Sequence, residues 1–127
     1  MATIRDIVFD CAHPASLARF WAAVLDGYDI APYDDAELER LHQLGITGTE
    51  DDPGVLVVAG PGRPRLYFQR VPESKTVKNR VHIDVDAADH AAELERLRGL
   101  GARVLGDFPE WTTMADPEGN EFCVMKV

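Results

Sequence analysis

Two stretches of the chain carry, at matching positions, polar side chains that could bind a metal or transfer a proton. Asp6 and Asp10 lie in one segment of alternating polar and apolar residues, and His82 and Asp86 lie in another. One offset of 76 residues superposes both pairs (82 − 6 and 86 − 10). Imidazole and carboxylate groups bind metals and transfer protons near neutral pH. The repeat therefore indicates the positions at which chemistry would take place.

His82 is the first candidate catalytic residue. It could bind a metal as neutral imidazole, act as a general base, or form a structural hydrogen bond to Asp84 or Asp10. The carboxylates of Asp10, Asp84 and Asp86 would repel one another if they were packed together, and their pKa values would rise. A cation, arginines or contact with water could relieve this repulsion. A carboxyl group of raised pKa beside His82 would form a general acid/base pair.

Asp6 is the second candidate, either as a metal ligand or as the partner of Arg5 or Arg80 in an ion pair. Cys11 and Cys123 lie in strand-like segments, and both are expected to be small buried apolar residues. Two cysteines are too few for a disulfide framework, and the chain has no Cys-x-x-Cys motif.

Four further residues are candidates for the wall of a substrate pocket, together with Asp10 and Asp84. They combine aromatic rings or apolar bulk with polar groups, which suits a flat or apolar ligand, although packing in a core would explain them equally well. They are Tyr67, Gln69, Trp111 and Met125.

Each half of the chain predicts one strand, one helix and about three further strands. In the first half, apolar residues from Leu17 to Leu25 recur at helical spacing after Pro14, and Gly27 is expected to end the helix. The expected strands are residues 4–10, 28–31, 55–59 and 65–71, with an extra helix at 34–44.

In the second half, the helix is expected to turn Ala87, Ala91, Leu94 and Leu97 inward and to end at Gly101. The expected strands are residues 80–86, with Val81, Ile83 and Val85 inward, then 103–105, 111–115 and 120–127. The segment Asp116-Pro117-Glu118-Gly119 fits a type I turn. We expect one domain over residues 1–127, with repeat one at 1–72, a linker at 73–79 and repeat two at 80–127.

The net charge is −9 and the pI is about 4.7, which argues against a nucleic-acid partner because such binding needs basic surface. No apolar stretch is long enough to span a membrane, and the N-terminus lacks the order of a signal peptide. We therefore expect a cytoplasmic protein with neither membrane nor nucleic acid as partner.

The doubled strand–helix–strands pattern, with Phe20-Trp21 to Gly27 in the first helix and Asp116-Pro117-Glu118-Gly119-Asn120-Glu121-Phe122 before the last strand, resembles the vicinal oxygen chelate superfamily. This superfamily includes glyoxalases, bleomycin-resistance proteins, extradiol dioxygenases and methylmalonyl-CoA epimerase. The segment from Phe68 to Glu73 is similar to the glyoxalase-like subgroup. The resemblance implies an α+β fold, in which two βαβββ repeats form a curved mixed β-sheet around a cleft.

The resemblance also implies a site. Metal-using members hold a divalent ion at four positions, which correspond here to Asp6, Gln69 (Tyr67 on a shifted alignment), His82 and Cys123. Only His82 is the residue type of the metal-using pattern; Asp6 replaces a histidine and Cys123 replaces a glutamate. The implied cofactor is Zn, Ni, Mn or Fe, or none if these replacements abolish the site.

Two functions follow from the resemblance, and both involve a small-molecule ligand and a homodimer. The first is a glyoxalase-like lyase or isomerase acting on a small carbonyl substrate, with His82 and Asp6 as catalytic residues. The second is a non-catalytic protein that sequesters a small aromatic or cationic molecule, as bleomycin-resistance proteins do. In that case acidic groups would attract the ligand and Trp111 would stack on it.

Overall fold

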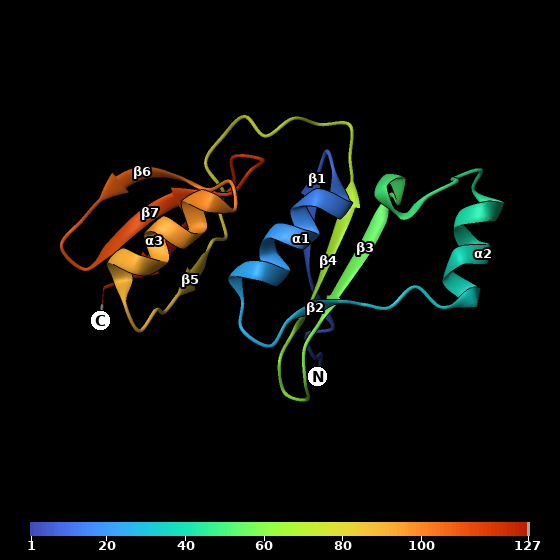
Figure 1. The fold of residues 1–127 in the computed structure, drawn as a ribbon, viewed down its shortest axis with the longest axis horizontal. Helices are drawn as coiled ribbons and strands as arrows, with labels where there is room; N and C mark the ends of the chain where they lie inside the picture. The colour runs from blue at the N-terminus through green and yellow to red at the C-terminus, as the bar shows by residue number, and fades with distance from the viewer. Residues whose placement is uncertain (127) are drawn as a thin grey trace. The chain divides into compact units, whose positions relative to one another are not determined.

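The computed structural model describes residues 1–126 and forms two compact units, which are treated separately below (Figure 1). Unit one is Met1–Ser74, and unit two is Lys75–Val127, of which Val127 lies outside the described residues. Each unit contains a four-stranded mixed sheet. The expected α+β class with two βαβββ repeats is confirmed. No described helix has the length and apolar character of a membrane span.

Unit one has the strand order β1-β4-β3-β2, in which β1 and β4 are parallel and the other neighbours are antiparallel. A second helix and a 3₁₀ turn lie between β2 and β3 in the sequence. The elements are β1 (Asp6–Cys11), α1 (Pro14–Val24), β2 (Asp29–Ile30), α2 (Asp35–Gln43), η1 (Thr49–Asp51), β3 (Gly54–Val58) and β4 (Arg65–Arg70).

Unit two repeats this topology with the strand order β5-β8-β7-β6, and β5 is again parallel to β8. A register shift interrupts the pairing of β6 with β7 between Val104 and Gly106. The elements are β5 (Ile83–Val85), α3 (His90–Gly99), β6 (Arg103–Asp107), β7 (Trp111–Ala115) and β8 (Glu121–Met125).

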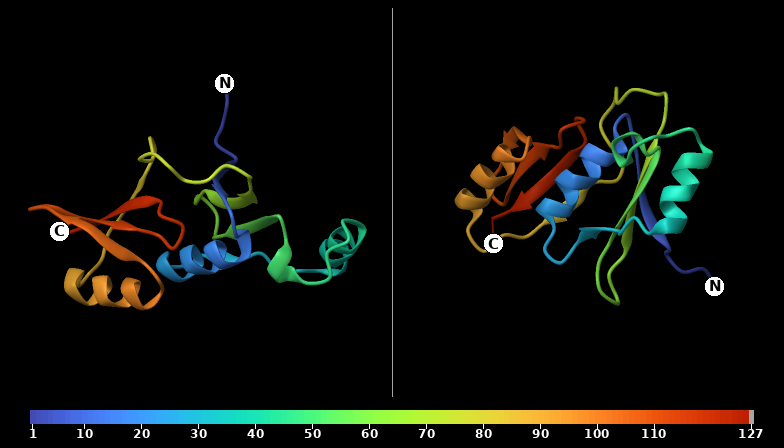
Figure 2. Two further views of the ribbon diagram at one scale, coloured as in Figure 1. Left: turned by 90° about the horizontal axis from the view of Figure 1, so that it is seen from above. Right: turned by 45° about the vertical axis from the view of Figure 1, so that its right-hand side comes forward.

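Helix α1 covers one face of the unit-one sheet because its apolar residues form a continuous stripe. Leu17, Phe20 and Trp21 are each at most 4% exposed, and Phe9 of β1 packs between the rings of Trp21 and Phe68. The two rings lie 5.4 and 4.7 Å from that of Phe9, centroid to centroid. Seen from above in Figure 2, each of α1 and α3 lies against one side of its own sheet.

Helix α1 ends at Val24, before the glycine that was expected to cap it. Leu25 has an extended backbone, and the amide of Tyr28 donates to the carbonyl of Leu25. Gly27 is the third residue of that turn and has φ +76°, a backbone conformation that favours glycine. The expected left-handed glycine is therefore confirmed, although it belongs to a turn after the helix.

The expectations for β5 and α3 need correction. The strand begins at Ile83, so Val81 precedes it and is 81% exposed, not buried. The helix begins at His90, where the Asp89 carboxylate accepts a hydrogen bond from the Ala92 amide. This late start leaves Ala87 outside the helix and Ala91 exposed. Of the expected inward residues, Leu97 is fully buried and Leu94 is half-buried.

The turn before β8 forms as expected, since the Gly119 amide donates to the Asp116 carbonyl at 2.9 Å. The Asp116 side chain, 1% exposed, also organises this turn. Its carboxylate accepts hydrogen bonds from the amides of Glu118 and Asn120 and from the Asn120 side chain, at 2.9–3.2 Å. These contacts explain why the Asp-Pro-Glu-Gly-Asn segment forms this turn.

Asp107 at the end of β6 should titrate below its usual range. Lys126 lies 2.9 Å from its carboxylate, and the Thr112 hydroxyl donates to it at 2.8 Å. Both contacts lower the pKa of Asp107, and the contact with Lys126 has the larger effect. A lowered folded pKa contributes stability that is complete above the unfolded value, about 3.9, and is lost as pH falls through the folded pKa. Carboxyl ¹³C NMR of wild type and Lys126→Met should show a higher Asp107 pKa in the variant. An unchanged titration would refute the assignment to Lys126.

Candidate functional site

The sheet of unit two has one buried face and one more open face. Thr112, Met114, Phe122 and Val124 point to the buried side and are at most 1% exposed, as is Leu97 of α3. Side chains alternate along a strand, and directly paired residues share a face. The register pairs Asp84 and Thr113 with Cys123, and Trp111 with Met125. Five residues therefore share the open face: Asp84, Trp111, Thr113, Cys123 and Met125.

His82, Asp84 and Cys123 come together on this face. One ligand atom from each lies within 4.8 Å of the other two, and the His82 Nε2 atom is 3.3 Å from the Asp84 Oδ1 atom. The side chains of His82 and Asp84 are 40% and 55% exposed, whereas Cys123 is buried. The sequence left Asp84 and Asp10 open as structural partners of His82, and the structure shows Asp84 beside it. We call these three residues the His–Asp–Cys cluster.

The donor set of the His–Asp–Cys cluster fits a Zn²⁺-type ion. Zinc bonds of about 2.0–2.3 Å in a tetrahedron place ligand atoms roughly 3.3–3.8 Å apart, so the three side chains need only small adjustments. Catalytic zinc sites have three protein ligands and leave the fourth position for water or substrate. The exposure of His82 and Asp84 leaves such an open side.

Thr113 and Trp111 support the sulfur atom of the cluster. The indole N–H of Trp111 donates to Thr113 Oγ1 at 3.2 Å, and Thr113 Oγ1 lies 3.6 Å from Cys123 Sγ. A hydroxyl that accepts from the indole retains its own hydrogen, so it can donate to a thiolate at Cys123. Such outer contacts orient metal ligands. Thr113 was missed in the sequence, although its position two residues after Trp111 on a strand places it on the same face.

The predicted site residues of unit one share the face of their sheet opposite α1. The register pairs Asp6 with Arg65, Val8 with Tyr67, and Asp10 with Gln69. The Gln69 side chain donates to the Asp10 carboxylate at 2.8 Å. This amide satisfies one oxygen of Asp10, and both residues belong to unit one.

Asp6 forms an ion pair with Arg65, and the Arg65 Nε atom lies 2.7 Å from the Asp6 Oδ1 atom. The partner is therefore neither Arg5 nor Arg80, which corrects the expectation from the sequence. The reason is the parallel pairing of β1 with β4, which puts Asp6 beside a residue 59 positions away. A metal ion at Asp6 would have to compete with this guanidinium group.

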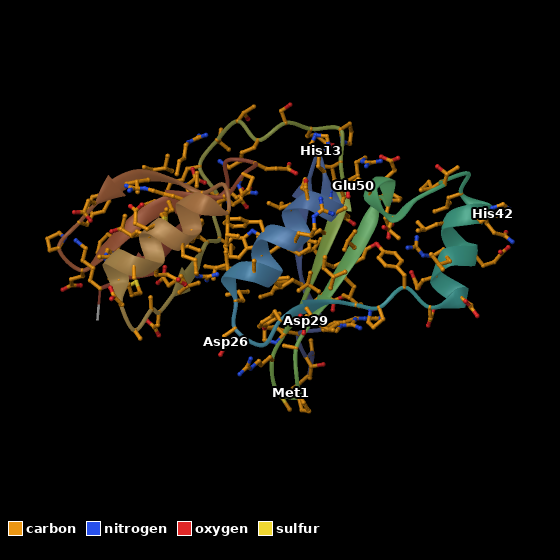
Figure 3. All side chains as sticks on the ribbon, in the orientation of Figure 1. Met1, His13, Asp26, Asp29, His42 and Glu50 are labelled. Atoms are coloured by element: carbon orange, nitrogen blue, oxygen red, sulfur yellow. The ribbon has the colours of Figure 1, made fainter. Side chains whose placement is uncertain are left out.

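Three of the four histidines lie outside the candidate metal cluster of the described structure. His13 precedes α1 and His42 lies on α2, and both are exposed (Figure 3). His90 Nε2 lies 3.0 Å from the hydroxyl of the buried Thr112, on the covered side of the unit-two sheet. In the described structure, His82 alone among them belongs to a potential metal cluster.

The fold and the sequence together define the class of protein: the chain belongs to the glyoxalase-like domain family, which matches residues 6–125. This places it in the vicinal oxygen chelate superfamily, as the sequence resemblance implied. No curated protein matches the chain in sequence.

Several solved structures share the fold at low sequence identity. The fosfomycin resistance protein FosX of Mesorhizobium loti has a TM-score of 0.68 at 14% identity, over 100% of this chain and 93% of that one. A FosX mutant of Listeria monocytogenes, complexed with Mn(II) and 1S,2S-dihydroxypropylphosphonic acid, has a TM-score of 0.66 at 9% identity, over 98% and 90%. A glyoxalase/bleomycin resistance protein/dioxygenase family enzyme of Burkholderia phytofirmans has a TM-score of 0.65 at 14% identity, over 97% of both chains. These similarities establish the fold alone.

Proposed function

We propose that this protein is a metal-dependent lyase or isomerase that acts on a small carbonyl substrate. The observation that supports this proposal is the convergence of His82, Asp84 and Cys123 on the open face of the unit-two sheet. Membership of the glyoxalase-like family agrees with it. Asp84, a candidate substrate-binding residue in the sequence, becomes a metal ligand in this proposal. Asp6 could act as a catalytic residue only if it gave up its ion pair with Arg65. Gln69 could act as a metal ligand only if it gave up its hydrogen bond to Asp10.

The ligand types favour Zn²⁺ over the other ions expected from the sequence. Thiolate and imidazole ligands suit zinc, whereas Mn²⁺ is favoured by carboxylate, carbonyl and water oxygens. The Mn(II) in the Listeria FosX complex is therefore not carried over to this chain. A bound divalent cation would act as a Lewis acid and stabilise negative charge that develops on a substrate oxygen.

The neighbouring side chains would position the substrate. Trp111 stacks on Phe108 with ring centroids 5.1 Å apart, and it is paired with Met125 across the sheet. Met125 lies on β8 with Cys123 and Trp111 lies on the neighbouring β7, so these two side chains present an apolar surface beside the cluster. Such a surface suits the carbon skeleton of a small substrate, while the polar cluster beside it suits the carbonyl group.

Metal analysis of protein purified without chelator tests this proposal. We expect about one equivalent of zinc in wild type and in His42→Ala, and loss of the metal in His82→Ala. His42 is a matched control because it is exposed on α2 and lies outside the cluster. A wild-type protein that is free of metal and stays so after incubation with Zn²⁺, Ni²⁺, Mn²⁺ and Fe²⁺ would refute the proposal.

The ion pair of Asp6 with Arg65 favours a second candidate, the metal-free binding protein. In that case the guanidinium group has replaced the cation at the first of the four metal positions implied by the resemblance. The protein would then sequester a small aromatic or cationic molecule on Trp111, and chelators would not change its binding. The homodimer implied by the resemblance stays a prediction under either function.

A further inference from the structure

Unit one contains an insertion that its repeat does not have. Both units share the βαβββ topology, but α2 and η1 separate β2 from β3 in unit one. In unit two the corresponding strands, β6 and β7, are joined by residues 108–110 alone. The insertion is therefore unnecessary for completing the sheet. Figure 1 shows α2, in teal, standing beside the strands of unit one without adding to their sheet.

A buried carboxylate holds the insertion to the sheet. Asp52, 1% exposed, accepts hydrogen bonds from the Tyr33 hydroxyl at 2.8 Å and from the Gly54 amide at 2.9 Å. Arg40 of α2 donates to the same carboxylate at 3.2–3.3 Å, and its Nε atom donates to Glu37 at 3.0 Å. The insertion is thus a fixed structure with a satisfied polar network.

The insertion and the sheet together border a partly open cavity of about 320 Å³. This volume lies within the range of about 300–1,000 Å³ that is typical of small-molecule sites. Leu56 and Tyr67 line it from the strands, and Tyr33 lines it from the insertion. Gly54 makes room for Tyr67, because a Cβ atom on Gly54 would lie 2.0 Å from the Tyr67 hydroxyl oxygen.

The charged groups that line the cavity carry one net negative charge. Glu37 and Asp52 are the two carboxylates, and Arg40 is the single cation among the described lining residues. Arg40 already contacts both carboxylates, so an anionic ligand would meet no unpaired cation. The two tyrosine rings offer electron-rich faces, which attract cations.

We propose that this cavity binds a small organic amine in its protonated form, with a compact apolar body. The ammonium group would lie near Glu37, whose side chain is 46% exposed and uses one carboxylate oxygen for Arg40. The apolar body would contact Leu56 and the tyrosine rings. This site lies wholly within unit one and does not depend on the His–Asp–Cys cluster of unit two.

NMR titration of the full chain with three probes of similar size tests the proposal: phenethylamine, phenethyl alcohol and hydrocinnamate. We expect saturable shifts of the backbone amides of Gly54, Leu56 and Tyr67 with the amine, at an affinity about fivefold above that of the alcohol. The carboxylate should bind most weakly. Adding a chelator should leave these results unchanged, so a failure of the proposed metal centre would not affect them.

Two variants on α2 separate the cavity from general surface charge. Glu37→Gln should reduce amine affinity about fivefold and leave alcohol affinity unchanged, since it removes the net negative charge of the cavity. Glu39→Gln is the matched control, because Glu39 accepts a hydrogen bond from the Gln43 side chain and does not line the cavity. The proposal would be overturned if the amine and the carboxylate bound with equal affinity, or if the shifts were confined to other residues. It would also be overturned if Glu37→Gln bound the amine as tightly as wild type.

Discussion

Replacing Asp116 by alanine should lower the free energy of unfolding by about 3 kcal/mol. The Asp116 carboxylate is almost fully buried and accepts hydrogen bonds from two backbone amides and one side-chain amide in the turn before β8. A hydrogen bond to a charged group contributes about 1.5–3 kcal/mol, and a buried donor left without its acceptor costs about 1–3 kcal/mol. Alanine would leave the amides of Glu118 and Asn120 without this acceptor.

Urea unfolding followed by circular dichroism would measure this effect. Asp116→Asn should lower the free energy of unfolding by less, since its amide oxygen can still accept from the backbone. Some loss is expected because its NH₂ group and that of Asn120 are both donors. Asp86→Ala is the control, because Asp86 is exposed in the same unit and should change stability by less than about 0.5 kcal/mol. Equal stability of the Asp116→Ala and Asp86→Ala proteins would contradict the structural role given to this carboxylate.

Replacing Cys123 by serine should weaken Zn²⁺ binding at least about 100-fold. Mutation of groups that only support metal ligands typically costs 10- to 100-fold in affinity, so loss of a ligand should cost at least as much. Serine preserves the size of the buried side chain and its contact with Thr113, but its hydroxyl group is not a comparable zinc ligand. Competition with a chromophoric chelator would measure the affinity.

Cys11→Ser provides the matched control for this experiment. Cys11 is the other buried cysteine, and it lies in unit one, outside the His–Asp–Cys cluster. Its replacement should leave Zn²⁺ affinity within about twofold of wild type. If both serine variants bind Zn²⁺ as tightly as wild type, Cys123 is not a ligand.

Much of the fold was predictable because it depends on local patterns. The alternation in β1, the apolar stripe from Leu17 to Val24 and the turn at Asp116 each follow from a few neighbouring residues. Burial of both cysteines was also confirmed. The start of β5 was mistaken, because alternation continues through Val81 although pairing with β8 begins only at Ile83. Sequence periodicity does not show where pairing ends.

The candidate site was predictable in its residues and less so in its partners. The spacing of His82 and Asp84 puts both on one face of an extended segment, and this is a local property. The pairing of Asp84 with Cys123 depends on the parallel register of β5 and β8, and the Asp6–Arg65 pair depends on that of β1 and β4. Register between distant strands is set by the packing of the whole sheet, so no short segment reveals it.

Absorption spectroscopy of the protein titrated with Co²⁺ tests the central claim, that His82, Asp84 and Cys123 hold a divalent cation. Cobalt adopts zinc sites and reports a bound thiolate through sulfur-to-metal charge transfer. The proposed centre predicts saturation at one equivalent with a charge-transfer band that is present in Cys11→Ser and absent in Cys123→Ser. Wild-type protein that binds no Co²⁺, or binds it without this band, would contradict the claim.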